Sequence, residues 1–292
     1  DGEFRRSYWH LDFMWGFAGI DEVELDHGYY FQGEETTHGS IRVSGKISGE
    51  NHPFVEHYKF VKQFEDENTV ARQTMPSPAQ TRFVLTGNAA AYPYDEFYKN
   101  DDELTADIVA AYRQVIADLY AAGCRNVQFD DCTWTRLCDA SVRERLGWSD
   151  EDALRLQQEN LDVINAVIAD QPDDLVINTH VCRGNFHSTW LSSGGYAPVA
   201  AKLFGEENVD AYYLEFDDDR SGDFAPLAEV SGDKKVVLGL ITSKKPDLED
   251  PDTIKARIQE AAQYIPLDRL CLSTQCGFAS TQEGNKLTED QQ

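Results

Sequence analysis

Short apolar segments alternate with longer segments of helical spacing along most of the chain. The apolar segments are rich in β-branched and aromatic residues, and polar or glycine-containing stretches bound them, which is typical of buried strands. The strands predicted in this way are Thr69–Thr74, Asn126–Asp130, Leu175–Thr179, Ala211–Phe216, Val236–Thr242 and Arg269–Thr274.

Three of the intervening segments have the 3.6-residue period of amphipathic helices. Leu104–Ala122 places apolar side chains three or four residues apart, and Asp150–Ala169 and Asp252–Tyr264 do the same. Before the last of them, Asp250 can cap the helix and Pro251 follows at its first turn, which is a common helix start.

The alternation of strands and helices predicts an α/β fold with a parallel sheet and helices outside it. Six such units favour a closed (β/α)8 TIM barrel, for which about 250 residues suffice. A doubly wound sheet is the alternative, but the chain has no glycine-rich dinucleotide turn. His27–Gly49 has two alternating runs around a polar turn, which predicts an inserted β-hairpin. No linker divides the chain, so we expect residues 1–292 to form one barrel domain.

Composition and charge narrow the class of protein. The net charge is −26, which argues against nucleic acid as a partner because phosphate contacts need clustered Lys and Arg. No apolar run reaches the roughly 18 residues of a membrane span, so no membrane partner is expected. The six cysteines are too sparse for the disulfide scaffold of a secreted protein, and we expect reduced thiols in a cytoplasmic protein.

Candidate metal ligands follow three of the predicted strands. His180 and Cys182 are two residues apart, so they lie on one face of an extended segment. Glu215 lies near the end of the next strand, and Cys276 follows the last one. Barrel enzymes carry their chemistry at the carboxyl ends of the strands, and two thiolates, one imidazole and one carboxylate suit Zn²⁺.

Each of these residues also has a structural interpretation. Cys182 is equally compatible with an ordinary buried thiol, His180 with a core histidine, and Glu215 with the start of a solvated acidic loop. Cys271 is expected in the core, because its strand alternates toward the helices. Cys132 and Cys138 form a rival metal pair, but no comparable set of convergent ligands surrounds them.

A pair of acidic residues, Asp130 and Asp131, ends another predicted strand. At this edge of a barrel, a carboxylate can bind a substrate ammonium group or act as a general base. The alternative is that the pair only caps the following helix. We favour Asp130 as the functional member, because it directly ends the apolar run.

The combination of these motifs resembles the catalytic barrel of the cobalamin-independent methionine synthases, and above all the short, single-barrel members of that family. The resemblance spans nearly the whole chain. The stretches that carry it are DGEFRR, VQFDD, NTHVCRGN, GGYAPVAAKLF, YYLEFDDDRSGDFAPL, VVLGLITSKKPDLED and STQCGFASTQEGN.

The resemblance implies a zinc-dependent methyltransferase that moves a methyl group to the thiol of homocysteine and forms methionine. The family's zinc ligands fall on the four residues that the strand ends indicate. Its homocysteine-binding acids fall on Asp130 and Glu3, and a folate-contacting arginine falls on Arg42. The first barrel strand of the family is expected before Asp1.

The methyl donor is left open by departures from the family pattern. The longer enzymes have a second barrel that helps to hold polyglutamyl folate, and no counterpart occurs here. Their proton-donating histidine aligns near Thr242–Lys244, where none of the residues is histidine. Homocysteine is therefore the firmer expectation, and the donor is methyl-folate or another methyl compound.

Three other functions compete with this one. A zinc-dependent transfer to another thiol, such as coenzyme M, needs a cation for the sulfonate where Asp130 and Glu3 stand. A tetrapyrrole decarboxylase on a related barrel needs no zinc, so the four ligands argue against it. An inactive zinc-binding fragment is the non-enzymatic alternative, and a thermal melt with a chelator beside a turnover assay separates it from the enzymes.

The acidity itself yields a prediction. Acidic residues number 52 against 26 basic ones and are spread along the chain, which fits either a strongly solvated surface or adaptation to high salt. If it is an adaptation, screening of self-repulsion should raise the melting temperature steadily from low to molar KCl. A melting temperature that does not change over this range leaves only the solvated surface.

Overall fold

The structure, a computed structural model, describes residues 8–279 and 281–292. None of the helices in this part of the chain combines the length and apolar character that crossing a membrane requires. In chain order the helices and strands are α1 Trp9–Met14, β1 Ala18–Glu24, β2 Tyr30–Phe31, β3 Glu34–Glu35, β4 Gly39–Ser48, α2 Phe54–Lys62, β5 Gln73–Pro76, α3 Pro78–Gly87, α4 Asp101–Ala121, β6 Asn126–Asp131, α5 Thr133–Cys138, α6 Ala140–Leu146, α7 Asp150–Ile168, β7 Val176–Val181, α8 Ala200–Glu206, β8 Ala211–Glu215, β9 Lys235–Ile241, α9 Pro251–Ala261 and β10 Leu270–Thr274.

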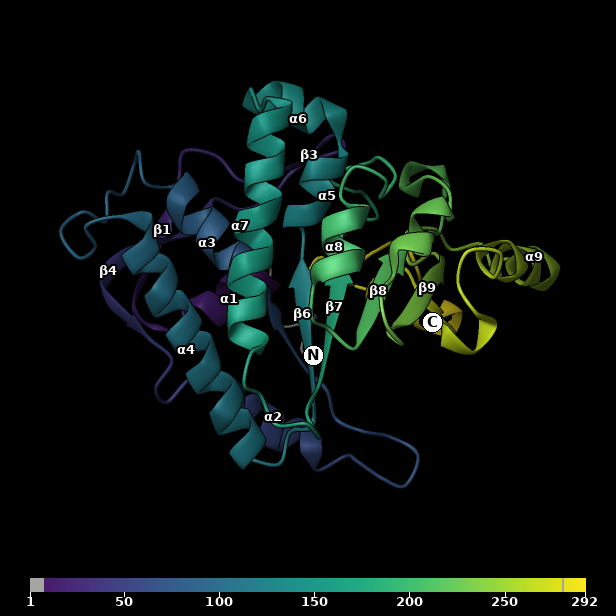
Figure 1. The fold of residues 1–292 in the computed structure, drawn as a ribbon, viewed down its shortest axis with the longest axis horizontal. Coiled ribbons are helices and arrows are strands. Elements are labelled where there is room, and N and C mark those ends of the chain that lie inside the picture. Colours follow the sequence, from purple (N-terminus) through teal and green to yellow (C-terminus); the bar gives the residue numbers. More distant parts are fainter. Residues whose placement is uncertain (1–7, 280) are drawn as a thin grey trace.

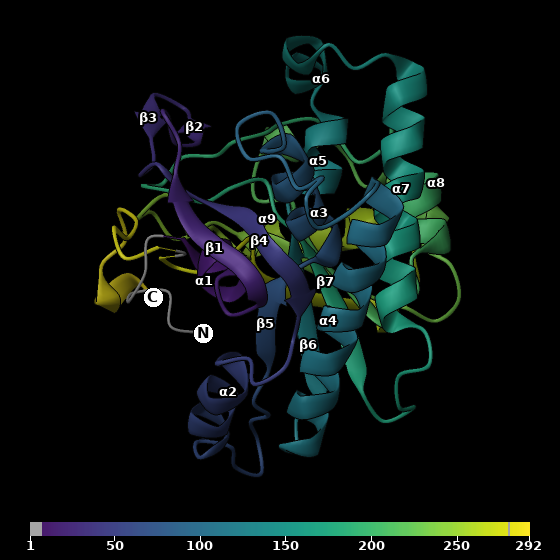
Figure 2. The same cartoon turned by 90° about the vertical axis from the view of Figure 1, so that its left-hand side faces the viewer.

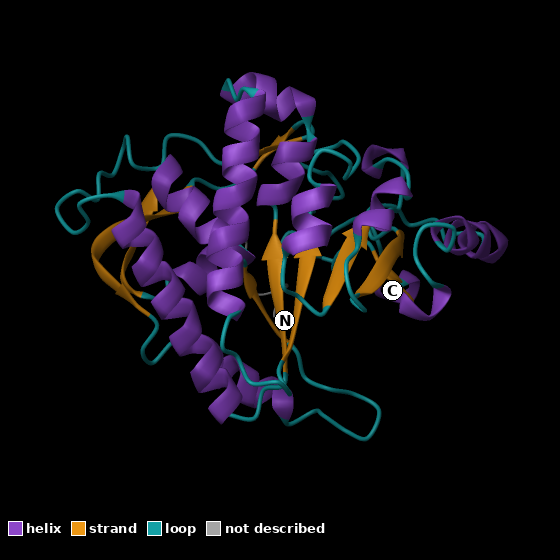
Figure 3. Ribbon diagram, in the orientation of Figure 1, coloured by secondary structure: helices purple, strands orange, loops and turns teal. Residues whose placement is uncertain are grey.

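Six strands form one parallel sheet in the order β10-β9-β8-β7-β6-β5. All six correspond to strands expected from the sequence, and five of them begin and end within two residues of the predicted bounds. The α/β class and the parallel sheet are therefore confirmed. Figure 3 shows the strands side by side with their helices around them.

The strand order distinguishes between the two architectures considered above. Neighbours in the sheet are also neighbours in the sequence, whereas a doubly wound sheet reverses direction at a switch point. Figure 1 shows α4 and α7 along one face of the strands. Within the described residues the outer strands β5 and β10 do not pair with each other, so closure into a full barrel is not confirmed.

The first strand of the sheet was predicted several residues too early. Thr69 belongs instead to a turn, in which the Asp66 carboxylate accepts hydrogen bonds from the Asn68 N–H and the Thr69 hydroxyl, both at 2.8 Å. The strand that follows ends at Pro76, which has no N–H to donate. Because β5 is an edge strand, the missing donor is tolerated.

The predicted hairpin bounds of residues 27–49 were also wrong. The long strand β4 pairs with β1, which begins nine residues before His27, and β2 and β3 form a separate short hairpin beyond them, as Figure 2 shows. The alternation of β1 is weak because Ile20 is its one buried residue, and acidic side chains face solvent. Gly19 adopts a φ of 78° beside the register shift, where a Cβ would lie 2.3 Å from the Lys46 carbonyl oxygen.

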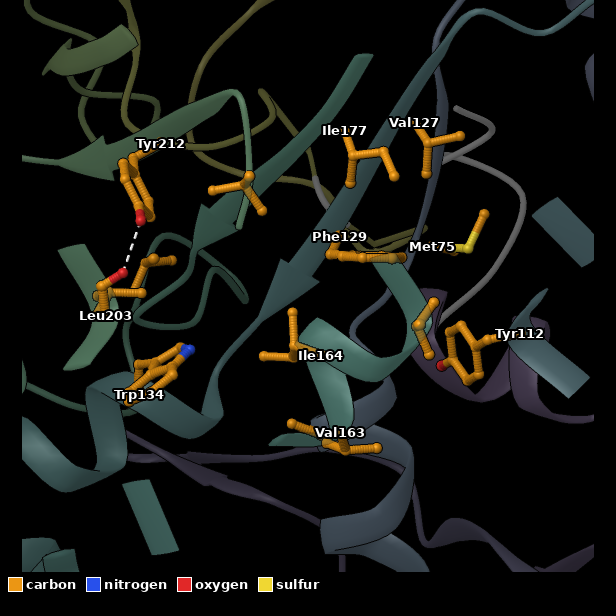
Figure 4. Packing of buried hydrophobic residues seen from close by; sticks show 14 of the residues in the cluster. Met75, Tyr112, Val127, Phe129, Trp134, Val163, Ile164, Ile177, Leu203 and Tyr212 are labelled. Carbon is orange, nitrogen blue, oxygen red and sulfur yellow. Dashed lines mark hydrogen bonds between the residues drawn. The ribbon is translucent and has the colours of Figure 1, made fainter. Parts of the chain in front are cut away.

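The alternation of β6 separates the core from the opposite face of the sheet. Val127 and Phe129 are buried, and Figure 4 shows Phe129 near Ile164 of α7 and Val127 beside Ile177. The residues that alternate with them, Asn126, Gln128 and Asp130, face the other side of the sheet. The same strand thus supplies an apolar face to the core and a polar face to the site described below.

The expectation that Cys271 lies in the core was wrong. Cys271 is exposed, and its neighbour Leu272 is 48% exposed. The reason is the position of β10 at the edge of the sheet, beside β9, against which α9 packs. All six cysteines are free thiols.

Glu207, just after α8, is a buried acid on the helix side of the sheet. Its side chain has no solvent exposure, and hydrogen bonding with the Trp134 side chain is a minor stabilising influence on its charged form. Burial, reinforced by the charge of Asp131, raises its pKa well above the usual range, although Lys234 opposes the shift. The folded chain therefore holds a proton that the unfolded chain releases above about pH 4.5, so this group makes stability fall as pH rises.

We expect Glu207→Gln to remove this loss. The wild-type free energy of unfolding should fall, relative to the variant, by up to about 1.4 kcal/mol per pH unit above about pH 4.5. Urea unfolding at about pH 5 and about pH 8 measures the effect. Glu206→Gln, an exposed neighbour paired with Lys202, is the control and should keep the wild-type profile. Parallel profiles for wild type and Glu207→Gln would contradict the assignment.

Candidate metal centre

Four side chains gather where β7, β8 and β10 end. His180 and Cys182 come from the end of β7, Glu215 from the last position of β8, and Cys276 from the segment after β10. One ligand atom from each of them lies within 4.8 Å of all the others. The structure thus brings together the four residues that were expected from the sequence to bind metal.

The orientation of His180 suits a ligand. Its Nδ1 lies 3.2 Å from the Tyr213 carbonyl oxygen, which can only accept, so Nδ1 carries the proton and Nε2 faces the cluster. Nε2 lies 4.0 Å from Glu215 Oε1. Burial alone lowers the pKa of His180, but the hydrogen bond and charge of the Cys276 thiolate, with the nearby carboxylates, raise it to about 10.

Glu215 has no solvent exposure. Its Oε1 accepts a hydrogen bond of 2.8 Å from the Arg183 backbone N–H, whereas Oε2 is buried without a hydrogen bond and lies 3.5 Å from Arg220 Nη2. Burial raises the pKa of Glu215, and the positive charge of Lys244 is the main opposing influence. Lys244 is buried after β9, in the segment where the family's histidine was expected, and its Nζ lies 3.3 Å from Asn185 Oδ1.

The pKa values of the two thiols in the cluster are shifted in opposite directions. Hydrogen bonding from Cys182 and the charge of His180 lower the pKa of Cys276 well below its usual range, although burial opposes them. The pKa of Cys182 is raised, first by its hydrogen bond with Cys132 and then by Cys276. The Gly184 N–H also donates to Cys182 Sγ at 3.3 Å. Cys276 is thus the thiolate, and thiolates are the form that binds metal.

The donor set fits zinc better than it fits a hard cation. Two sulfurs, one imidazole nitrogen and one carboxylate oxygen are ligands of Zn²⁺ sites, whereas Ca²⁺ and Mg²⁺ prefer oxygen. Glu215 Oε2 is buried and has no hydrogen bond within the described residues, which is expected of an atom reserved for an ion. Elsewhere in residues 8–279 and 281–292 no other such group of three or more ligands is found. The rival pair Cys132 and Cys138 does not belong to the cluster. Cys132 lies beside it, in contact with Cys182, and Cys138 is a buried thiol whose pKa is raised by burial to about 12.

Asp130 lies next to His180 across the sheet, in direct register. Its Oδ1 accepts a hydrogen bond of 2.7 Å from Gln128 Nε2, and Gln128 Oε1 in turn accepts one of 2.8 Å from Arg72. Burial raises the pKa of Asp130 to about 6, so its carboxylate is mostly ionised at neutral pH. Arg72 and Gln128, which the sequence analysis missed, therefore fix the orientation of Asp130. The alternation of β6 could have revealed Gln128, because it shares a face with Asp130.

The remaining predicted residues lie elsewhere. Asp131 is buried and accepts hydrogen bonds from Ser77 and from the N–H and hydroxyl of Thr133, so it holds the start of α5. Arg42 lies on the exposed face of β4, 3.1 Å from Asp21, and does not line the cavity described next. Glu3 is outside the described residues.

A cavity of about 310 Å³ opens beside the cluster. His180, Cys182, Cys276 and Asp130 are among the residues that line it. The wall also has an aromatic part. Tyr29 and Phe31 of this part belong to the predicted hairpin 27–49, whereas Tyr8, Trp9, His10 and Phe186 come from segments for which no element was predicted. The volume is at the lower end of the range for small-molecule sites.

Several known proteins are similar to this chain in sequence. Residues 61–289 match the catalytic-domain model of the cobalamin-independent synthase family. The chain is 44% identical to YxjH of Bacillus subtilis, over 100% of this chain and 76% of that protein. It is 22% identical to the methionine synthase of Saccharolobus solfataricus, over 89% of this chain and 73% of that enzyme.

Two solved structures are similar over nearly the whole chain. A candidate vitamin-B12-independent methionine synthase from Listeria monocytogenes has a TM-score of 0.74 and 36% identity, covering 97% of this chain and 76% of that one. A B12-independent methionine synthase from Shewanella sp. W3-18-1, in complex with selenomethionine, has a TM-score of 0.70 and covers 99% of this chain and 76% of that one. At 19% identity, the second supports the fold alone.

The ligand set predicts which cysteines retain zinc. Cys182→Ser and Cys276→Ser should each lose most of it, because a hydroxyl replaces a thiolate ligand. Cys271→Ser, on the exposed edge strand, and Cys132→Ser, beside the cluster, should keep about one zinc per chain, as should wild type. Metal analysis of the purified proteins by plasma mass spectrometry provides the measurement. Full zinc content in Cys276→Ser would exclude the proposed ligand set.

Proposed function

Because this chain belongs to the cobalamin-independent methionine synthase family, we propose that it is a zinc-dependent methyltransferase that moves a methyl group to the thiol of homocysteine and forms methionine. The observation that carries the proposal is the cluster of His180, Cys182, Glu215 and Cys276 within 4.8 Å, with Asp130 beside it. The cluster would bind the zinc ion that activates a thiol, and Asp130 would bind the ammonium group of an amino-acid acceptor.

The four residues would hold the zinc ion, which supplies the deprotonation of a substrate thiol near neutral pH. Their two thiolates and one carboxylate carry three negative charges, one more than the ion neutralises. Such a ligand set favours a nucleophilic thiolate over activation of water. Arg220 and Lys244 limit the excess charge, because both act on the Glu215 carboxylate from the buried side.

In this proposal the acceptor is oriented by Asp130. Its carboxylate binds the ammonium group of homocysteine, and the chain from Arg72 through Gln128 keeps it aimed into the cavity. A sulfonated thiol would be repelled by the same carboxylate, which disfavours coenzyme M as acceptor. Glu3 is the second ammonium contact that the family resemblance implies.

Methyl-folate is one class of methyl donor. The family resemblance implies that Arg42 contacts the folate, whereas in this structure Arg42 pairs with Asp21. We also propose that the six sequential strands form part of the wall of a (β/α)8 barrel, because residues of five of them, all but β9, line one cavity among the described residues.

Asp130→Asn tests the acceptor assignment. A carboxylate paired with an ammonium in a partly dry site contributes about 1.5–3 kcal/mol, so the homocysteine KM should rise roughly 10- to 100-fold. Zinc content should be retained, because other strands bind it. Steady-state kinetics with homocysteine and with 2-mercaptoethanol, which lacks an amino group, provide the measurement.

Two controls distinguish loss of the ammonium contact from a general loss of activity. Turnover of 2-mercaptoethanol should change little in Asp130→Asn, and Asp174→Asn, at an exposed aspartate paired with Arg125, should behave as wild type. If Asp130→Asn leaves the homocysteine KM unchanged or removes the zinc, Asp130 is not the ammonium contact.

A further inference from the structure

Cys276 has a less regular backbone than the other three ligands. His180 and Glu215 belong to β7 and β8, and Cys182 directly follows β7. Each of these two strands pairs with a neighbour on both sides, which fixes its backbone. Cys276 instead lies two residues beyond the edge strand β10, in a bend outside any helix or strand. The position of this ligand therefore depends on contacts from other segments.

One buried residue, Ser243 after β9, contacts the residues on both sides of Cys276. Its backbone N–H donates to Gln275 Oε1 at 2.6 Å, and its hydroxyl accepts a hydrogen bond of 2.9 Å from Gln275 Nε2. The same hydroxyl donates to the Gly277 carbonyl oxygen at 2.8 Å. Ser243 and Gln275 are 0% and 1% exposed, so water does not compete for these hydrogen bonds. One residue thus holds the chain before and after Cys276.

Asn185 connects this arrangement to the segment of another ligand. It lies three residues after Cys182 and is 6% exposed. Its Nδ2 donates to the Gly277 carbonyl oxygen at 2.8 Å, and its Oδ1 accepts a hydrogen bond of 2.9 Å from Asn285 Nδ2. Asn285 also donates to the Ser243 carbonyl oxygen at 3.0 Å. The segments after β7, β9 and β10 are therefore joined next to both sulfur ligands.

A purely structural role is the alternative, because buried polar groups are almost always hydrogen-bonded. The two roles have different consequences. A structural network stabilises the metal-free and the metal-bound chain alike, whereas a residue that orients a ligand changes the metal affinity. The hydrogen bonds of Ser243 converge on the two residues that flank one ligand, which favours the second role.

We propose that Ser243 is a positioning residue of the metal centre, which holds the Cys276 thiolate at its ligand position with the help of Gln275 and Asn185. The inference rests on the zinc ion of the proposed function and deepens it, because it names the residues that act on the ion through a ligand. A zinc–sulfur bond is about 2.3 Å long, and ligands must be held within about 0.5 Å of their working position. A segment free to move further than this would weaken the bond.

Ser243→Ala tests the role through zinc affinity, measured on the full chain by competition with a chromogenic chelator. The variant loses the hydroxyl that joins Gln275 to Gly277, so it should bind zinc roughly 10- to 100-fold more weakly than wild type does. Thermal melts of both proteins without metal measure the separate effect on folding.

Ser231→Ala is the matched control, because Ser231 precedes β9 as Ser243 follows it. Its hydroxyl likewise donates to a carbonyl oxygen, that of Gly205, at 2.9 Å and accepts a hydrogen bond of 2.9 Å from Lys234 Nζ. It lies at the amino end of the strand, whereas the ligands follow the carboxyl ends. This variant should melt at a lower temperature without metal and keep the wild-type zinc affinity.

Two further variants show whether the effect passes through Cys276. Gln275→Met keeps most of the side-chain volume but removes both hydrogen bonds to Ser243, so it should also weaken zinc binding roughly 10- to 100-fold. In a Cys276→Ser background, which has already lost the ligand, adding Ser243→Ala should change the residual zinc affinity by less than about twofold.

Wild-type zinc affinity in either Ser243→Ala or Gln275→Met would overturn the positioning role, and so would an equal loss of affinity in Ser231→Ala. A further tenfold or larger loss in the Cys276→Ser background would also overturn it, since the effect would not pass through that ligand. If wild type binds no zinc, the metal assignment fails and the inference fails with it. The predicted order of zinc affinities in a protein that transfers no methyl group to homocysteine would support the inference while the proposed function fails.

Discussion

The buried carboxylate of Glu215 is the constraint on which the rest of the site depends. An ionised carboxylate without solvent contact costs several kcal/mol unless other groups compensate it. Compensation comes from the Arg183 N–H after β7, from Arg220 after β8 and from Lys244 after β9. Each of these groups lies in a different loop, so the site requires all three loops in place.

The sheet makes this arrangement possible by separating two environments across one layer. On β6, Phe129 packs against the helices and Asp130 faces the cavity, and on β7 the same alternation places His180 and Cys182 together on the cavity side. A shift of one residue in the register would exchange these environments, placing acids in the core. Packing of the apolar face therefore determines which side chains reach the metal.

Much of this architecture could be predicted because strong local signals coincide with the sheet. The apolar runs of β6 to β10 are bounded by polar residues, and the four ligands and Asp130 lie directly at strand ends, where topology alone brings them together. Predictions were wrong where the sequence signal was weak, at solvent-exposed segments and at the edge of the sheet. The acidic β1 has little alternation, and Cys271 occupies a strand whose outer side is uncovered. The part of Arg72 in the site could not be predicted, because Arg72 precedes β5 in the sequence and reaches Gln128 only when β5 and β6 are paired.

The central claim is that three parallel strands deliver two sulfurs, one nitrogen and one oxygen to a single zinc ion. Zinc K-edge X-ray absorption of the purified protein tests it directly. The account predicts two sulfur atoms at about 2.3 Å and two lighter ligands at about 2.0–2.2 Å. A shell of nitrogen and oxygen alone, or a third protein sulfur contributed by Cys132, would contradict it.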